Sequence, residues 1–473
     1  MAANLQKLKK NKRNKKYKNK TLKEIAKLES LKQINLNAAG IDIGSEELWV
    51  CVPEDRDAQS VKCFSTFTCD LKAIAAWLKA CGVETVAMES TSIYWVPLYE
   101  TLEAHGFEVY LVNARDIKNV PGRKTDILDC QWLQQLHTYG LLRRSFRPDA
   151  EIVELRDLVR HKDDLIQHRS PHIQHMQKAL HLMNLQLDNV ISDITGYTGM
   201  QILRAIVCGE RDPQVLARYR DRRCKNSLEV IAKSLEGNYK ETHVFQLKQA
   251  LELYDFYTEK ITECDQQIQG IYQKMACQVD MLEQSESDPA DLNGDGTLSH
   301  SVVEYELRDY LHRITGVDLC AIDGLGPVSV QTIISEIGVD MSRWPTEKHF
   351  ASWLCACPMH KISGGKILSN RTRKTNSRAY KALRMSALSL HRSDSSLGAY
   401  FRRMRARLGA PKAITATAHK LARLIYRMLQ EKVEYVDLGA DYYEEKYKER
   451  EIKKLKRKAA KLGLQVVLKE QQQ

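Results

Sequence analysis

Short apolar runs separated by turn residues fill the first part of the chain, and they restrict it to a sheet-containing fold. Ala38 to Ile43 and Glu46 to Val52 are strand-like and are joined by Gly44-Ser45, as in a hairpin. The pattern then continues as a strand at 61–67, a helix at 71–80 and a strand at 85–89. This order predicts an α/β domain near the amino terminus.

Four carboxylates stand at special points of this predicted domain. Asp42 lies in the first strand, Glu89 closes a strand and faces outward, and Asp126 and Asp129 begin a segment of helical spacing from Thr125 to Tyr139. Side chains at i and i+3 share one face of a helix, so the two aspartates point the same way. We expect all four acids to meet, with Mg²⁺ or Mn²⁺ making them tolerable together, as in a two-metal phosphodiester site. The alternative is four solvated acids, with Asp126 favoured by the dipole of its helix.

The order strand-Asp, strand-Glu, helix Asp-x-x-Asp resembles the RuvC-like, RNase H-fold domain of IS110-family transposases. Later motifs resemble the second domain of that family, and the resemblance spans roughly residues 38 to 430. These motifs are Ile314 to Val317, Ile322 to Pro327, Ile333 to Gly338, Phe350 to Pro358, Ser363 to Lys366, Asn376 to Arg378, and Leu383-Arg384.

The resemblance implies a nucleophilic serine at Ser363, within the basic glycine loop from Lys361 to Lys366. A serine among cations can attack a phosphodiester while those cations stabilise the developing charge. Ser369 is the nearby competitor, and an ordinary turn serine is the alternative. The predicted nucleic-acid contacts around this loop and before the acidic pair are Lys124, Lys366, Arg371, Arg373, Lys374 and Arg378.

Ile322 to Pro327 lies between two helical segments and resembles a helix-hairpin-helix. Gly324 and Gly326 permit backbone N–H groups to face a phosphate at a helix start. Such a contact grips the backbone of a nucleic acid rather than reading bases. A plain glycine-containing helix connection is the alternative.

The chain is predicted to comprise an α/β part and an all-α part. The predicted segments are a basic disordered tail (1–35), a RuvC-like catalytic domain (36–148), a helical coiled-coil arm (149–280), a polar insertion (281–305), a mostly helical transposase domain (306–435) and a charged tail (436–473). In the family the arm resembles an element for oligomerisation and nucleic-acid contact. Within the insertion, residues 291–297 resemble half of a calcium loop, but Val302 stands where that loop needs a bidentate acid.

Charge favours a polyanionic partner, since the chain carries a net charge of +12. No apolar run approaches membrane-spanning length, so we expect a cytoplasmic, nucleoid-associated protein of a bacterium or archaeon.

The resemblance implies a DNA recombinase of an insertion sequence, which excises and inserts the element by Mg²⁺- and serine-dependent strand exchange. Its implied partners are DNA, a structured noncoding guide RNA and further copies of the chain, as a dimer or tetramer. Two alternatives stay open: a RuvC-like junction nuclease that uses only the four acids, and a non-catalytic nucleic-acid-binding protein.

Overall fold

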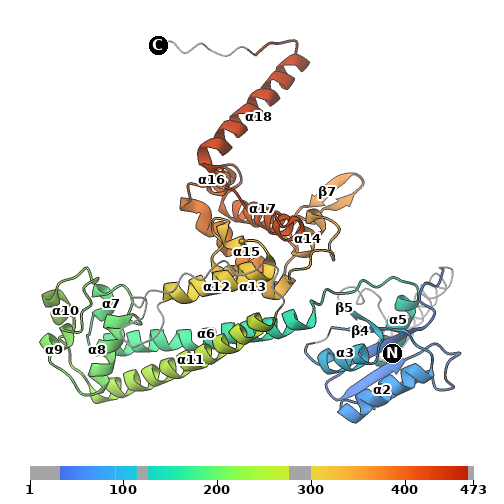
Figure 1. Ribbon diagram of the computed structural model, residues 1–473, viewed down its shortest axis with the longest axis horizontal. Coiled ribbons are helices and arrows are strands. Elements are labelled where there is room, and N and C mark those ends of the chain that lie inside the picture. The colour runs from blue at the N-terminus through green and yellow to red at the C-terminus, as the bar shows by residue number, and fades with distance from the viewer. Residues whose placement is uncertain (1–31, 91, 114–125, 276–299, 467–473) are drawn as a thin grey trace, which may run out of the picture. The chain divides into compact units, whose positions relative to one another are not determined.

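The computed structural model describes residues 32–90, 92–113, 126–275 and 300–466. Residues 1–31 of the predicted tail, Lys124 and the calcium-like run 291–297 lie outside these ranges. The chain divides into two compact units, Met1–Arg147 and Pro148–Gln473 (Figure 1). Within the described ranges, no helix has the length and apolar character needed to cross a membrane.

The first unit is built on a five-stranded mixed sheet with the strand order β3-β2-β1-β4-β5. The strands are β1 (Ala38–Ile43), β2 (Glu47–Cys51), β3 (Val61–Ser65), β4 (Thr85–Glu89) and β5 (Glu108–Val112). The pairs β1–β2 and β2–β3 are antiparallel, whereas β1–β4 and β4–β5 are parallel. The predicted hairpin and the strands up to Glu89 are confirmed, and β5 extends the sheet beyond them.

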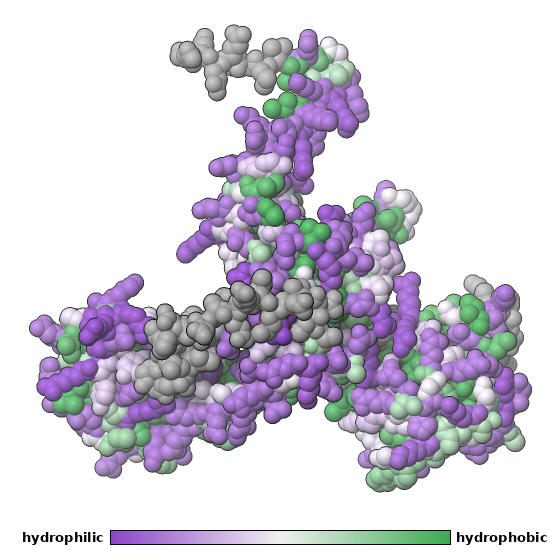
Figure 2. Space-filling view, in the orientation of Figure 1, coloured by the Kyte–Doolittle hydropathy of each residue, from purple (hydrophilic) through white to green (hydrophobic). Residues whose placement is uncertain are grey.

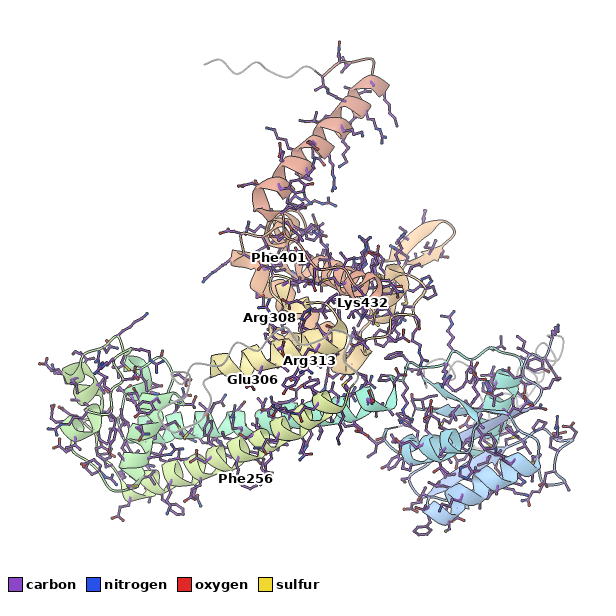
Figure 3. All side chains as sticks on the ribbon, in the orientation of Figure 1. Phe256, Glu306, Arg308, Arg313, Phe401 and Lys432 are labelled. Carbon is purple, nitrogen blue, oxygen red and sulfur yellow. The ribbon has the colours of Figure 1, made fainter. Side chains whose placement is uncertain are left out.

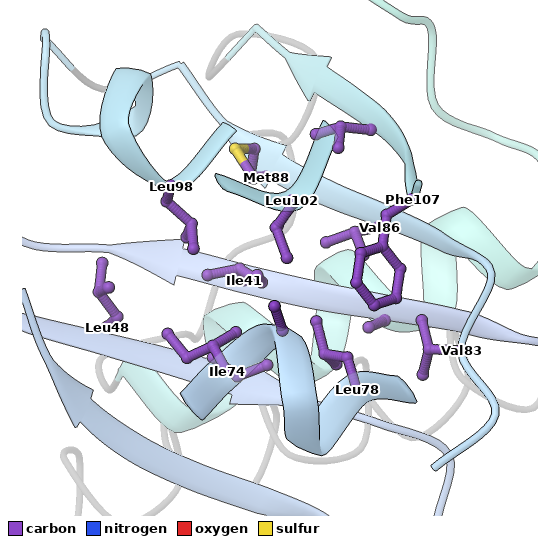
Figure 4. Close-up of a cluster of buried hydrophobic side chains, with 14 of the residues drawn as sticks. Ile41, Leu48, Ile74, Leu78, Val83, Val86, Met88, Leu98, Leu102 and Phe107 are labelled. Carbon is purple, nitrogen blue, oxygen red and sulfur yellow. The ribbon is translucent and has the colours of Figure 1, made fainter. Parts of the chain in front are cut away.

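Helices cover both faces of this sheet. The helices α2 (Thr68–Ala80) and α3 (Trp95–Ala104) bury an apolar cluster against one face, including Ile41, Met88 and Leu98 (Figure 4). The helix α5 (Asp126–Thr138) lies on the other face, where Leu133 and Leu136 pack with Ala87 and Val112. Covering on both faces explains why β1 and β4 read as nearly continuous apolar runs.

The second unit begins with two long helices, α6 (Ala150–Leu182) and α11 (Glu241–Lys274). Lys162 forms an ion pair with Asp265, and Arg169 Nη1 donates to Thr258 Oγ1 at 3.2 Å. The partner number falls as the residue number on α6 rises, so the helices run antiparallel (Figure 1). The predicted pair of long antiparallel helices is confirmed.

A small helical tip connects the far ends of these two helices, and the predicted arm of two helices alone was therefore incomplete. The tip comprises α7 (Leu187–Val190), α8 (Tyr197–Val207), α9 (Pro213–Ala217) and α10 (Leu228–Ser234). Leu203, Leu216 and Ile231 are fully buried there, in one core with Leu180 of α6 and Leu247 of α11. These helices are too short to give a long periodic signal in the sequence.

The rest of the second unit is mostly helical. Its elements are α12 (His300–Thr315), α13 (Pro327–Ile337), α14 (Glu347–Trp353), α15 (Arg378–Ser389), α16 (Ser396–Leu408), α17 (Ala410–Glu431) and α18 (Gly439–Lys461), the 3₁₀ turns η2 (Leu319–Ala321) and η3 (Leu390–Arg392), and the hairpin strands β6 (Lys361–Ser363) and β7 (Lys366–Ser369). The helix α17 buries Leu421, Ile425 and Leu429. Just after it, Lys432 Nζ donates to the Thr315 carbonyl at 2.7 Å, which joins the ends of α17 and α12 (Figure 3).

Candidate active site

Asp42 and Glu89 come to the same edge of the first sheet because β1 and β4 are parallel. The register pairs Gly40 with Ala87 and Ile41 with Met88, so the next pair along is Asp42 and Glu89. Alternate side chains of a strand share a face, which puts Asp42 on the face of Gly40 and Glu89 on the face of Ala87. Ala87 packs in the core beneath α5. Both acids therefore lie on the sheet face that α5 covers.

Close packing of α5 on β1 brings the other two acids to Asp42. A Cβ atom at Gly40 would lie 2.3 Å from the Gln134 nitrogen and 2.4 Å from the Cys130 carbonyl oxygen. Only glycine allows the helix backbone to approach this closely, because any side chain would push it away. Asp126 and Asp129 occupy the first turn of α5, directly before Cys130. The glycine at position 40 thus sets the distance between the two acidic elements.

The pKa of Asp42 responds to burial and to the charges of the other three carboxylates. Burial raises the pKa of Asp42 to about 6, and the charges of Asp129, Asp126 and Glu89 add to the rise in that order. A backbone hydrogen bond at Ile43 acts weakly in the opposite direction. Like charges disfavour one another's ionisation only when they are near. That the four side chains meet at one metal site stays a prediction from the sequence.

The donor set at this point consists of carboxylate oxygens, which are the ligands that Mg²⁺ and Mn²⁺ favour. In the part of the chain that the structure describes, no three histidine, cysteine, aspartate or glutamate side chains are arranged so that together they could hold a metal ion. The four acids are electrostatic neighbours, each able to contribute an oxygen. Magnesium keeps several of its own waters, so such an open carboxylate set fits it.

Two cysteines beside the acids were not singled out from the sequence. Cys130 follows Asp129 on α5, and its Sγ donates to the Ile127 carbonyl at 3.1 Å. Hydrogen bonding with Cys51 of β2 and burial raise the pKa of the Cys130 thiol, and the Asp42 charge adds to this. The thiol stays protonated and is not a nucleophile. The sequence does contain a signal for Cys130, because a residue four positions after Asp126 lies on the same face of the helix.

His137 fixes the other end of α5. Its Nε2 lies 2.8 Å from Thr85 Oγ1, and that hydroxyl donates to the Glu108 carbonyl at 3.0 Å. The hydroxyl hydrogen is used in the second bond, so Nε2 carries the proton in the first. Burial lowers the pKa of His137 to about 4, and the imidazole is therefore neutral near pH 7. It holds α5 against the starts of β4 and β5, while the acids lie at the strand ends.

Ser363 lies in the second unit, at the end of β6 rather than in an irregular flexible loop. Gly364 and Gly365 have φ angles of +53° and +75°, as the tight turn of a two-residue hairpin requires. The register of the hairpin pairs Ser363 with Lys366. Both residues are exposed, and so are Ile362, Ile367 and Leu368. The serine is thus presented at the tip of a projecting hairpin, with an ammonium group on the paired residue.

The predicted basic contacts around the serine divide into two groups. Lys366, Arg371 and Lys374 are exposed. Arg373 donates to the Ser352 carbonyl at 2.5 Å, and Arg378 donates to Asp163 of α6 at 2.7 Å and to Asp164 at 3.3 Å. Arg378 therefore ties α15 to α6, and Arg373 ties the segment after the hairpin to α14.

The two glycines of the predicted helix-hairpin-helix differ in their surroundings. Gly324 has a φ angle of +84°, and a Cβ atom there would lie 2.7 Å from the Ser386 carbonyl oxygen of α15. Gly326 has open space around it and precedes Pro327, the first residue of α13. Packing on α15 accounts for glycine at position 324, whereas Gly326 leaves the start of α13 accessible.

Two family models match the chain. Residues 39–184 match the transposase model of the IS110 type with the DEDD motif, and residues 318–402 match the transposase model of the IS116/IS110/IS902 family. The chain is an IS110-family transposase. The first match contains Asp42, Glu89, Asp126 and Asp129, and the second contains Ser363. A search of curated proteins gave no significant match.

The family assigns the protein to the enzymes of DNA transposition, which bind DNA. The tip helices α7 to α10, the helix α12 and all of the chain after residue 402 lie outside both matched segments of this transposase.

Proposed function

We propose that this transposase excises and inserts a mobile element by metal-dependent, serine-dependent strand exchange, on an RNase H-like (RuvC-like) first unit. The observation that carries the proposal is the electrostatic effect of three carboxylates, those of Asp129, Asp126 and Glu89, on Asp42. Acids at a strand, a neighbouring strand end and one helix turn have no structural reason to converge, since convergence destabilises their charged forms.

Asp42, Glu89, Asp126 and Asp129 are proposed to hold Mg²⁺ or Mn²⁺. A bound ion would neutralise their repulsion and polarise a phosphodiester. Two neighbouring residues position these acids. Gly40 lets α5 approach β1 closely, and His137 holds the far end of α5 by its hydrogen bond with Thr85. The protonated Cys130 adds no further negative charge to the site.

Ser363 is proposed as the nucleophile. Its Oγ attacks the phosphorus of a DNA phosphodiester, the Ser363 proton leaves to solvent, and the bond from phosphorus to the departing strand breaks. The departing strand keeps its oxygen as a hydroxyl, and the other strand remains linked to Ser363. A hydroxyl from a different strand then attacks that phosphorus and releases the serine. One phosphodiester is exchanged for another, so no ATP is required.

Several cations are proposed to assist this exchange. Lys366 stands across the hairpin from Ser363, and Arg371 and Lys374 are exposed nearby in the chain. These groups suit the charge on a phosphate in the transition state. Lys124 precedes the acidic pair, and Gly326 leaves the start of α13 open to a DNA or RNA phosphate in a helix-hairpin-helix contact.

The acids and the serine belong to different units, and we propose that they form a composite site within a dimer or tetramer. The long antiparallel arm of α6 and α11 is the proposed element for coiled-coil oligomerisation. A structured RNA from the element is the proposed guide for target choice, and the basic surfaces would bind it.

A junction nuclease that uses only the acids is the second candidate. It is favoured by one observation: the three acids that raise the pKa of Asp42 belong, like Asp42, to the first unit. Under this candidate Ser363 is dispensable.

A circle-junction assay separates these functions. The gene is supplied with its native flanking DNA in bacteria, and rejoined ends are amplified for wild type, Ser363→Ala, the matched hairpin variant Ser369→Ala, and Asp126→Asn. The proposal expects junctions for wild type and Ser369→Ala only. Junctions with Ser363→Ala would favour the nuclease chemistry, and junctions with Asp126→Asn would remove the metal assignment.

A further inference from the structure

A cavity of about 390 Å³ lies between α16, α17 and α18, near the carboxyl end of the chain. Three tyrosines and three cations are prominent in its lining: Lys420, Tyr435, Tyr442, Tyr443, Lys446 and Arg450. Most of this site follows residue 402, beyond both segments matched to the transposase family. The cavity has a size suited to a small organic ligand or one nucleotide.

The wall behind the cavity is a stack of cations and aromatic rings. The Arg403 guanidinium lies 3.8 Å from the centre of the Tyr447 ring and 4.7 Å from that of Tyr443. The Lys420 ammonium lies 4.7 Å from the centre of the Tyr400 ring and 5.4 Å from that of Tyr443. Cation–π contacts of this kind hold rings in fixed orientations. Tyr443 and Tyr447 of α18 are thus pre-oriented on α16 and α17.

Carboxylates near the cavity leave this positive charge only partly neutralised. Within the described ranges, no ion pair joins Arg403, Lys420 or Arg450 to an acid, whereas Lys446 pairs with Glu449 at 3.1 Å. Asp437 accepts from the Ser396 backbone nitrogen at 3.1 Å and also from the Ser396 hydroxyl. Burial lowers the pKa of Lys420, as does the charge of Arg403. An anionic ligand would relieve this repulsion.

Two buried polar atoms at this place also lack partners. The Tyr443 hydroxyl and Arg403 Nη1 are buried without a hydrogen bond to any described residue. A buried donor without an acceptor is costly, so such groups are usually satisfied by a ligand or by water. Both groups can donate a hydrogen bond, so a ligand that satisfies them must present an acceptor oxygen or nitrogen.

We propose that this cavity binds one unpaired nucleotide of a nucleic-acid strand. Its base stacks on the exposed ring of Tyr442, its acceptors face the Tyr443 hydroxyl, and its phosphate lies by Lys446 and Arg450. Aromatic platforms beside cations are the usual means of holding single strands. A paired base is excluded, because its faces and edges are already occupied within the duplex.

The rest of α18 continues the positive surface away from the cavity. The helix buries no residue of its own, and its second half carries Lys453, Lys454, Lys456, Arg457, Lys458 and Lys461. Hydrophilic residues cover most of its visible surface (Figure 2). A strand anchored at the cavity would follow this helix through its phosphates. The inference deepens the proposed function, since it gives this transposase a single-strand site away from Ser363.

The test measures binding by the full-length Ser363→Ala protein, so that strand chemistry does not enter. Fluorescence anisotropy is recorded with a short labelled oligouridylate, the matching DNA oligonucleotide, and the same DNA as a duplex. The variants are Tyr442→Leu, Arg450→Gln and the matched α18 control Lys448→Gln, an exposed lysine outside the cavity lining. The proposal expects about tenfold weaker single-strand binding for Tyr442→Leu, unchanged duplex binding, and little effect of Lys448→Gln.

The two single-stranded probes distinguish RNA from DNA as the source of the nucleotide. Photocrosslinking of a 4-thiouridine oligonucleotide to the wild-type chain gives a second measurement that does not depend on folding of a variant. Crosslinks in the peptide that contains Tyr442 and Tyr443 are expected. Equal binding by Tyr442→Leu and the control, or crosslinks confined to other peptides, would overturn the proposal. The circle-junction assay tests the proposed strand exchange, and the anisotropy assay tests nucleotide binding at the cavity. A Ser363→Ala protein that forms no circle junctions but binds the single-stranded probe would support both proposals independently.

Discussion

The carboxylate of Asp129, on the first turn of α5, opposes ionisation of Asp42 on β1 more strongly than either of the other two acids does. Gly40 creates this relationship, since it lets the backbone of α5 lie directly on the strand two residues before Asp42. A backbone contact without side chains therefore sets the electrostatics of the proposed metal site. The metal-free protein carries the repulsion as a loss of local stability.

Removing the Asp42 charge should stabilise the metal-free first unit near pH 7. The folded pKa of about 6 exceeds the ordinary value of 3.8, so the free energy of unfolding falls as the pH rises from about 4 to about 6 and stays low above that. With a chelator present, Asp42→Asn should raise local stability by about 1 kcal/mol, allowing for solvent screening. Hydrogen exchange of β1 and α5 peptides measures this. Equal protection in Asp42→Asn and in the exposed control Asp55→Asn would contradict the convergence.

His137 should impose the opposite pH dependence. Its folded pKa of about 4 lies below the ordinary 6.5, so the folded unit loses stability as the pH falls from 6.5 toward 4. In an Asp42→Asn background, which lacks the other titration, the loss should reach about 3 kcal/mol near pH 4. Exchange of α5 amides is again the readout. The dependence should vanish in His137→Gln and persist in His105→Gln, and a flat profile for the background protein would disprove the assignment.

Magnesium should protect the amides of β1 and α5. An ion that binds only the folded acids stabilises them by about 1.4 kcal/mol at ten times its Kd. The protection should be larger at pH 7 than at pH 5, because a protonated Asp42 is a poor ligand. Asp126→Asn should abolish it and Asp55→Asn should not. Equal magnesium protection in both variants would place the ion elsewhere.

Removal of residues 1–20 should flatten the salt dependence of DNA binding. Residues 7–20 contain lysines and an arginine and no acid, so each phosphate that they neutralise adds about −0.9 to the slope of log K against log salt. Filter binding over a salt series measures that slope. An unchanged slope would mean that the tail does not contact DNA.

Local patterning predicted much of the first unit. The strands that contain Asp42 and Glu89 are buried on both faces of the sheet. Their residues are therefore almost continuously apolar, and this pattern is visible in the sequence. The i, i+3 spacing placed Asp126 and Asp129 on one helix face before any contact was known. The approach of α5 to Gly40 was not predictable, since it depends on a long-range contact with Gln134.

The second unit was less predictable because its chemistry depends on tertiary pairing. Arg378 reads as a phosphate contact in a basic segment, yet it pairs with Asp163 on a helix far away in the sequence. Arg160, a basic residue of α6, is likewise bidentate to Glu336, at 2.8 Å to each oxygen. The Gly-Gly pair after Ser363 is typical of a two-residue hairpin turn. The basic residues around the pair nevertheless led to the prediction of a loop.

The most direct test of the account is to trap the covalent intermediate. The purified transposase, with its RNA where one is required, is incubated with Mg²⁺ and a nicked element-end DNA whose cleaved fragment diffuses away, and the denatured adduct is digested and sequenced by mass spectrometry. The account predicts a DNA phosphate on Ser363, absent from Ser363→Ala and present in Ser369→Ala. Cleaved DNA that accumulates in Ser363→Ala, with no protein attached, would show that water is the nucleophile and that the four acids act alone.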